Sequence, residues 1–388
     1  MIQKRKYYSL IDKVYKWSNL FEAWKSVKKN KGSGGVDGIT IETFDVYAEQ
    51  NLREIQRLLK ENRYSPDPVL RTYIEKDNGK MRPLGIPTIR DRVVQQAVRQ
   101  IIEPIFEKDF YPHSYGFRKG RSAHQALDIV RKAKRAGYEH VLDLDIQSFF
   151  DEIPHGKLME KVNERISDGK VLKLISNWLT AGIMEDDQFH ETEVGSPQGG
   201  VISPLLANIY LNYFDWEMKK RGFPVVRYAD DAIVFCRSKH EALQALQVSK
   251  LILEGALQLR MHPEKTKVVH FDEGFRFLGF DFWKGYMVFP ADKIKKQKDK
   301  IRRVTRRQQG INLELMINKL NEVIRGFGNY YKVGNVRSKF LRLDQWIRMR
   351  ARAFMRKKKS TVSNRLISIK TLENAGLISL ESLLTTGS

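Results

Sequence analysis

The segment 225–235, Val-Val-Arg-Tyr-Ala-Asp-Asp-Ala-Ile-Val-Phe, constrains the fold more than any other part of the chain. Two runs rich in apolar and β-branched residues flank the adjacent acids Asp230 and Asp231, and such runs are typical of strands. Carboxylates are costly to bury inside a strand, so we expect the chain to reverse direction there. The segment therefore predicts a hairpin with a turn at Ala229-Asp230.

A second acidic strand is expected at 141–146, Val-Leu-Asp-Leu-Asp-Ile. Alternate side chains of a strand point to the same face, so Asp143 and Asp145 share one face. If this strand lies beside the hairpin, Asp145, Asp230 and Asp231 converge. Asp143 is then the rival of Asp145 for the same position.

Clustered carboxylates repel one another and are tolerated when a divalent cation neutralises them. Oxygen ligands favour Mg²⁺ over Zn²⁺. Two such ions about 4 Å apart activate an attacking hydroxyl and stabilise a leaving phosphate, as nucleotidyl transfer requires. A lone Asp-Asp pair more often caps a turn. The two apolar flanks and the second acidic strand favour the metal site.

The charge balance indicates a polyanionic partner. The chain carries 69 Lys and Arg against 46 Asp and Glu, a net charge of +23. Residues 291–360 alone hold 22 Lys and Arg against 5 Asp and Glu. Solubility needs only a small net charge of either sign, so nucleic acid is the better explanation.

The single cysteine, Cys236, excludes an internal disulfide and any zinc site built on paired cysteines. It stands in an apolar run and is expected in the core. No apolar run approaches the roughly 20 residues that a membrane span needs, and the first residues lack a signal-peptide core. We therefore expect a cytoplasmic protein with no membrane partner.

Apolar periodicity and turn residues predict mixed helices and strands up to about residue 290. Helices are expected at 43–60, 91–105, 123–136, 158–163, 171–180, 204–220 and 240–257. Strands are expected at 70–74, 81–86, 141–145, 225–228, 232–236, 267–271 and 275–282. The first two strands flank Asp77-Asn78-Gly79 and suggest a hairpin. Beyond Lys293 only amphipathic helices are expected, and the whole order predicts an α+β fold.

At the acidic turn the chain resembles the reverse transcriptases of group II introns, and the resemblance extends over nearly its whole length. The blocks that match the family in order are at 30–38, 82–88, 114–124, 145–151, 195–204, 228–231, 277–280 and 325–331. So many blocks in the right order make chance similarity very improbable.

The resemblance implies a right-hand polymerase with an antiparallel palm sheet and an all-helical, basic thumb. It implies an N-terminal basic helical extension at 1–30, fingers at 31–142 and a palm at 143–288, with fingers-associated helices around 152–195. The helical thumb or maturase domain and the C-terminal tail would follow at 289–388. The change of pattern in the sequence itself lies near 286–290.

The resemblance also implies roles for individual residues. Asp145 and Asp230 would hold two Mg²⁺ ions, with Asp231 assisting and Ile146 in the same metal site; Mn²⁺ could replace Mg²⁺. The residues expected to contact the nucleotide are Lys76, Arg82, Ile146, Phe150, Gln198 and Lys265. Phe150 would act as a steric gate against the ribose 2′-hydroxyl. The expected primer grip is Phe277, Leu278 and Gly279. Where the family has Ile-Pro-Lys, this chain has Ile74-Glu75-Lys76.

The implied function is an RNA-directed DNA polymerase that also binds intron RNA as a splicing and retrohoming cofactor. Its partners would be an RNA template and primer, deoxynucleoside triphosphates, intron RNA and target DNA. We expect an endonuclease-lacking member, since the cysteine pairs of that domain and a ribonuclease H segment are missing from the sequence. Two alternatives stay open. One is a domesticated reverse transcriptase in DNA repair, phage defence or spacer acquisition. The other is a splicing chaperone without polymerase activity, against which the intact acids argue.

Overall fold

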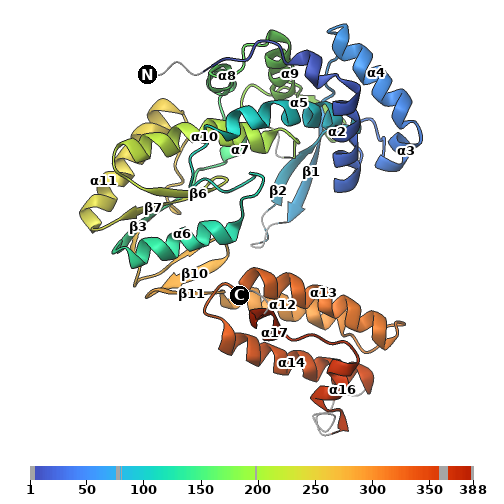
Figure 1. Ribbon diagram of the computed structural model, residues 1–388, viewed down its shortest axis with the longest axis vertical. Helices are drawn as coiled ribbons and strands as arrows, with labels where there is room; N and C mark the ends of the chain where they lie inside the picture. The colour runs from blue at the N-terminus through green and yellow to red at the C-terminus, as the bar shows by residue number, and fades with distance from the viewer. Residues whose placement is uncertain (1–4, 76–78, 80, 197–198, 358–365, 386–388) are drawn as a thin grey trace. The chain divides into compact units, whose positions relative to one another are not determined.

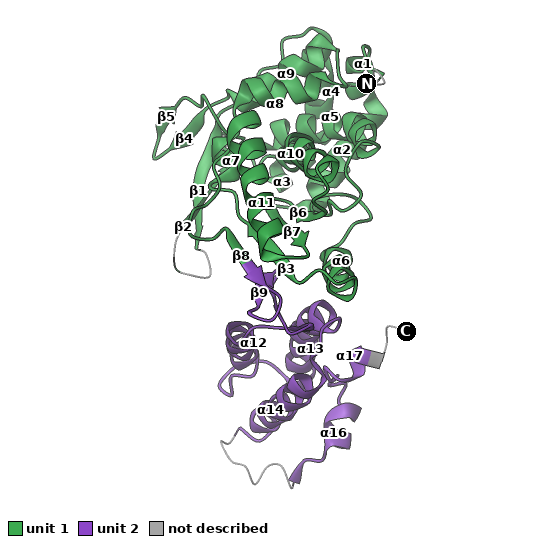
Figure 2. Ribbon diagram, turned by 90° about the vertical axis from the view of Figure 1, so that its left-hand side faces the viewer, with its two compact units in different colours: residues 1–268 green, residues 269–388 purple. Residues whose placement is uncertain are grey.

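The computed structural model describes residues 5–75, 79, 81–196, 199–357 and 366–385. The chain divides into two compact units, Met1–Val268 and Val269–Ser388 (Figure 2). This division falls earlier in the chain than the change of pattern near 286–290. The assignment of fingers, palm and thumb to residue ranges remains a prediction.

Helices dominate the first part of unit 1 (Figure 1). They are α1 (Ile11–Val14), α2 (Trp17–Asn30), α3 (Ile41–Val46), α4 (Ala48–Lys60) and α5 (Ile89–Glu107). The hydroxyl of Thr88 caps α5 by accepting a hydrogen bond from the Asp91 amide at 3.2 Å. Consecutive residues Val93 and Val94 are both fully buried. Because α5 is apolar on more than one side, it forms the centre of this part of the core.

The first sheet of unit 1 has the strand order β2-β1-β4-β5. Its strands are β1 (Val69–Glu75), β2 (Met81–Ile86), β4 (Ile183–Glu185) and β5 (Gln188–His190). The antiparallel pairing of β1 and β2 confirms the predicted hairpin, whose turn residues Asp77 and Asn78 lie outside the described residues. The sequence did not indicate β4 and β5. They are three residues each, too short to show a period.

The second sheet has the order β6-β7-β3-β8 and belongs to unit 1 except for the last two residues of β8. Its strands are β3 (His140–Leu144), β6 (Val225–Tyr228), β7 (Asp231–Cys236) and β8 (Lys267–His270). The pairs β3·β7 and β6·β7 are antiparallel, as predicted. Helix α6 (Ala123–Arg135) packs along β6, and α11 (Lys239–Lys250) packs along β3 and β7. Cys236 ends β7 opposite His140 and is fully buried.

The remaining helices of unit 1 connect these sheets. They are α7 (Phe149–Glu152), α8 (His155–Asn163), α9 (Gly169–Leu179), α10 (Ser203–Lys220) and the π-helix η1 (Leu251–Ala256), which continues α11. One hydrophobic cluster extends through the unit, from the N-terminal helices to η1.

Unit 2 joins a small antiparallel sheet to a group of helices. Its strands are β9 (Phe275–Phe277), β10 (Phe280–Trp283) and β11 (Tyr286–Val288). Its helices are α12 (Ala291–Val304), α13 (Leu313–Tyr331), α14 (Arg337–Met355), α16 (Ile369–Asn374) and α17 (Ser382–Thr385). Aromatic rings pack the end of the sheet against the helices. The ring centroid of Phe289, just after β11, lies 5.3 Å from that of Phe327 in α13 and 5.9 Å from that of Phe340 in α14. No helix in the described part of the chain is long and apolar enough to cross a membrane.

Two predicted elements are interrupted in the structure. The helix expected at 43–60 is two helices, because the chain leaves helical geometry at Tyr47 and the Asn51 side chain bonds the free carbonyl of Phe44 at 3.3 Å. The strand expected at 275–282 is the hairpin β9–β10. Its two turn residues, Leu278 and Gly279, have positive φ values of 47° and 73°, the geometry of a tight hairpin turn.

Candidate active site

The tight turn between β6 and β7 presents the adjacent acids. Tyr228 pairs with Asp231, which leaves Ala229 and Asp230 as the two loop residues. Ala229 has a φ of 60°, as a two-residue hairpin turn requires. The predicted hairpin and its turn are therefore confirmed.

Strand β3 brings Asp145 to this turn. The register pairs Asp143 with Ile233 and Leu144 with Ala232. Continued by one pair beyond Leu144 and Ala232, this register aligns Asp145 with Asp231, and the charge of Asp145 raises the pKa of Asp231. Directly opposed side chains have Cβ atoms about 4.5–5.5 Å apart, and like charges in such pairs destabilise a sheet. The three acids therefore converge.

The electrostatics of the site reflect this convergence. Asp231 is exposed to solvent, yet partial desolvation by the surrounding protein, followed by the charges of Asp230 and Asp145, raises its pKa to about 6. Burial also raises the pKa of Asp230, and Asp145 adds to that effect, while Arg82 and Arg227 oppose it. Burial, together with Asp231 and Asp145, raises the pKa of Asp143 to about 7. The site thus concentrates negative charge at a cost that a cation would relieve.

A lysine occupies part of this site. The ammonium of Lys265 donates to the Asp145 carboxylate at 2.8 Å. The segment that carries Lys265 is fastened to the end of β3 by the His262 amide, which donates to the Asp145 carbonyl at 2.8 Å. Ile146, the next residue, forms an isolated bridge with Met261. Lys265 is 63% exposed, so this ion pair is a weak one.

The donor set fits a hard divalent cation. Carboxylate oxygens of Asp145, Asp230 and Asp231, with the nearby Ile146 carbonyl, are the ligand types that Mg²⁺ prefers. The present side-chain positions do not form a ready cage: the described residues contain no group of three His, Cys, Asp or Glu side chains arranged to hold a metal ion. The Asp145–Lys265 pair would have to open for all three acids to turn to one ion.

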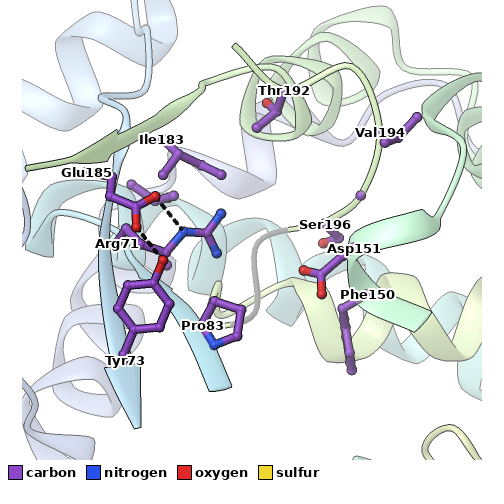
Figure 3. Close-up of a pocket in the computed structure, with 13 residues that line it drawn as sticks. Arg71, Tyr73, Pro83, Phe150, Asp151, Ile183, Glu185, Thr192, Val194 and Ser196 are labelled. Carbon is purple, nitrogen blue, oxygen red and sulfur yellow. Dashed lines mark hydrogen bonds and ion pairs between the residues drawn. The ribbon is translucent and has the colours of Figure 1, made fainter. Parts of the chain in front are cut away.

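A cavity of about 300 Å³ lies between the β1–β2 hairpin and α7 (Figure 3). Phe150 lines it and has a buried ring that meets Phe149 edge-on, with centroids 5.1 Å apart. Tyr73 of β1 donates a hydrogen bond to Glu185 of the neighbouring strand β4, and Arg71 lies 3.9 Å from the same carboxylate. Pro83, next to Arg82, completes the hairpin side. The cavity thus brings Phe150 and the predicted nucleotide-binding strand together.

The other predicted site residues are distributed as follows. Lys76 and Gln198 lie outside the described residues. Phe277 is the last residue of β9 in unit 2, and Leu278 and Gly279 form the turn to β10, where the hydroxyl of Tyr330 donates to the Leu278 carbonyl at 2.7 Å.

Comparison with known proteins agrees with this geometry. A family model described as "Reverse transcriptase (RNA-dependent DNA polymerase)" matches residues 74–282, which contain all three acids and the strands that carry them. A second model, "Group II intron, maturase-specific domain", matches residues 294–369. The chain belongs to the group II intron reverse transcriptase/maturase family. It therefore carries a reverse transcriptase domain followed by a maturase-specific domain.

Two relatives are similar over two thirds of this chain. Protein YkfC of Escherichia coli (strain K12) is 36% identical over 300 residues, which cover 67% of this chain and 79% of YkfC. Group II intron-encoded protein LtrA of Lactococcus lactis subsp. cremoris is 33% identical over 326 residues, covering 67% of this chain but only 54% of LtrA. A solved "Partial Cas6-RT-Cas1--Cas2 complex" is 26% identical, with a TM-score of 0.42, over 64% of this chain and 43% of that chain.

The structure also places polar residues behind the β6–β7 turn that the sequence did not single out. They are Asn208 and Asp215 of α10 and Arg227 of β6, all buried. The one signal in the sequence was Arg227 itself, a charged residue inside an apolar strand. Its partners are 12 or more residues away in the chain, so spacing alone could not identify them.

Proposed function

We propose that the chain is an RNA-directed DNA polymerase that extends a primer by two-metal nucleotidyl transfer. The observation that carries this proposal is the pairing of Leu144 with Ala232, which brings Asp145 to the turn that holds Asp230 and Asp231. In the reaction, the primer 3′-oxygen loses its proton and bonds to the α-phosphorus, while the bond to the departing pyrophosphate breaks. Two Mg²⁺ ions, which Mn²⁺ can replace, would neutralise charge on the attacking and leaving oxygens.

The residues of the chain would divide this work among them. Asp145 and Asp230 would hold the ions, with Asp231 and the Ile146 carbonyl completing the metal site. Arg82 would bind the triphosphate, since its charge already acts on Asp230. Phe150 would meet the sugar, which is supported by its position on the wall of the cavity.

Four further assignments complete the proposal. When metal ions bind, Lys265 would leave the Asp145 carboxylate and contact the phosphates of the incoming nucleotide. Lys76 and Gln198 would contact the nucleotide, and the Phe277–Gly279 turn would grip the primer; these assignments rest on the resemblance alone.

We further propose that the chain binds intron RNA, and with it target DNA, as a splicing and retrohoming cofactor. The match to the maturase-specific domain and the basic composition of residues 291–360 support this role. In unit 2, Lys298 and Arg302 of α12 both lie over the ring of Trp346 of α14, at 5.4 and 5.6 Å. A cationic surface with an aromatic ring suits unpaired RNA.

Primer extension tests the polymerase. With Mg²⁺, a primed RNA template and deoxynucleotides, the wild type should make complementary DNA. Asp230→Asn and Asp145→Asn should each lower the rate by at least roughly 10²-fold, because each removes charge from the reacting centre. The matched control is Asp128→Asn, an exposed acid of α6 that pairs with Lys132.

Template binding is measured separately on the same proteins. It should change little in all three variants, since none lies on the proposed RNA-binding surface. Undiminished DNA synthesis by Asp230→Asn would contradict the metal-site assignment.

A further inference from the structure

A buried ion pair lies directly behind the catalytic turn. Arg227, one residue before Tyr228, is 1% exposed, and Asp215 of α10 is fully buried. The guanidinium of Arg227 donates to both carboxylate oxygens of Asp215, from Nε at 2.8 Å and from Nη2 at 2.6 Å. Burying both charges carries a large desolvation cost, and an apolar pair of the same volume is often equally stable. A role beyond stability should therefore be sought for this pair.

The third edge of the guanidinium reaches the turn itself. Arg227 Nη1 donates to the carbonyl oxygen of Ala229 at 2.7 Å and to the Asn208 side chain at 3.1 Å. Ala229 holds a left-handed conformation that residues other than glycine rarely adopt. Its carbonyl belongs to the peptide that leads into Asp230. Arg227 thus fixes the orientation of the peptide plane that precedes the proposed metal ligand.

The loop at residues 113–116 also contacts Asn208, Arg227 and the β6–β7 turn. The Asn208 side chain donates to the carbonyl oxygen of Gly116 at 2.8 Å. A Cβ atom on Gly116 would lie 2.2 Å from the backbone nitrogen of Ala229, so only glycine fits there. Backbone bonds hold the same loop to Arg227: the Tyr115 amide donates to its carbonyl, and its amide donates to the His113 carbonyl.

We propose that Gly116, Asn208, Asp215 and Arg227 form a turn clamp, a set of positioning residues that holds Asp230 and Asp231 in register with Asp145. None of the four needs to touch substrate or metal. The inference rests on the proposed function, because it assigns the clamp to the carboxylates of that reaction. It also gives a role to the 114–118 block, to which the resemblance gave none.

The chemistry of arginine makes the clamp testable. Its planar fork serves a carboxylate, an amide oxygen and a carbonyl at once, whereas a lysine ammonium cannot reach all three in this geometry. Arg227→Lys therefore keeps the charge and loses the positioning. Misplacement of reacting groups by about 1 Å costs on the order of 10²-fold in rate. We expect kcat to fall by about that factor, with the KM for deoxynucleotides changed no more than a few-fold.

The experiment compares three variants of the full chain. Arg227→Lys removes the fork. The double variant Arg227→Met, Asp215→Leu removes both charges together, so that neither is left buried alone. Arg165→Lys is the matched control, because Arg165 donates to the carboxylate of Asp109 in the same unit but makes no contact with the turn. Each protein is assayed by thermal melting, by steady-state primer extension, and by hydrogen exchange without metal or substrate.

We expect the loss of kcat and the increase in hydrogen exchange at the turn to occur in the same variants. Both Arg227 variants should lose kcat and exchange faster in the peptide 225–235, with exchange in α5 unchanged; the control should change neither. The double variant should melt near the wild-type temperature. A folded Arg227 variant that keeps wild-type kcat, or wild-type exchange at the turn, would overturn the clamp. If the wild type extends no primer, the proposed polymerase fails, and the exchange comparison still decides whether these residues hold the turn.

Discussion

At the scale of single residues, Phe150 should control the choice of sugar. Phe150 lines the cavity beside the predicted nucleotide-binding strand, and a bulky ring that met the sugar there would clash with a 2′-hydroxyl. Phe150→Ala should raise the efficiency of ribonucleotide relative to deoxynucleotide incorporation by about 10-fold or more. Single-nucleotide kcat/KM values for the two sugars measure this ratio.

Phe149→Ala is the matched control for that change. Phe149 is equally buried and belongs to the same core, so both substitutions should destabilise the protein by about 3–5 kcal/mol. Only the Phe150 change should alter the sugar ratio. Equal ratios in the two variants would remove the gate role from Phe150.

Lys265 should compete with the metal for Asp145. An exposed ion pair contributes at most about 1 kcal/mol, so removing the ammonium should tighten Mn²⁺ binding by no more than about 5-fold. Lys265→Met, titrated with Mn²⁺ by electron paramagnetic resonance, tests this. Lys250→Met removes an equally exposed lysine that pairs with Glu254 and should leave the affinity unchanged. Weaker binding in Lys265→Met would show that the lysine does not compete.

The acids and the hairpin could be predicted from the sequence because their signals are local. Asp230 and Asp231 interrupt apolar runs, and a strand's alternation aligns Asp143 with Asp145. That alternation does not say which of the two lies nearer the turn, whereas the register pairs Asp143 with Ile233 and leaves Asp145, just past the strand, nearer to it. The assignment of Asp145 as the metal ligand remains a prediction. The partners of Arg227 could not be predicted, because α10 and the 113–116 loop meet β6 only in the folded chain.

At the scale of elements, one carboxylate joins two helices. Asp168 caps α9 by accepting from the Lys170 and Val171 amides, and it holds the start of α1 by accepting from Leu10 at 2.7 Å and Ile11 at 2.9 Å. Burial acts to raise its pKa, but these four bonds outweigh burial, and the folded pKa is lowered. Asp168→Asn should destabilise unit 1 by about 1–3 kcal/mol at neutral pH.

The sign of the pH dependence follows from that lowered pKa. The contribution of Asp168 is fully present above the pKa of the unfolded chain, about 3.9, and is lost as pH falls through the folded value. Urea unfolding of wild type and Asp168→Asn at pH 7 and at pH 3 measures this. The difference in unfolding free energy should shrink at the lower pH. A difference that grew on acidification would contradict the assignment.

Long helices with a regular apolar pattern were predicted well, and short elements and interruptions were not. Helices α5 and α6 appear within a few residues of their expected bounds, and α13 and α14 lie in the part of the chain where amphipathic helices were expected. The interruptions at Tyr47 and at Leu278-Gly279 are accompanied by long-range or local side-chain bonds: the Asn51 amide donates to the Phe44 carbonyl, and the Tyr330 hydroxyl donates to the Leu278 carbonyl. Such hydrogen bonds cannot be predicted from a pattern of apolar residues.

At the scale of the whole molecule, the net charge of +23 should make RNA binding steeply dependent on salt. A protein with several phosphate contacts releases counterions on binding, and we expect at least about a 10-fold loss of affinity between 50 and 200 mM salt. Filter binding across that range measures the slope. The double variant Lys298→Glu, Arg302→Glu should reduce the slope of RNA affinity against salt concentration. The same charge change on α11, Lys239→Glu with Lys250→Glu, should affect it less, and equal slopes would argue against α12 as the RNA-binding surface.

The burial of Cys236 has a practical consequence for site-specific labelling of this protein. It is the chain's single cysteine, fully enclosed at the end of β7, and burial raises the pKa of its thiol to about 12. Thiolate is the reactive form, so Cys236 should be inert to maleimide reagents in the folded protein. A cysteine introduced at an exposed position then takes a fluorophore or spin label alone, and the natural chain needs no prior removal of thiols.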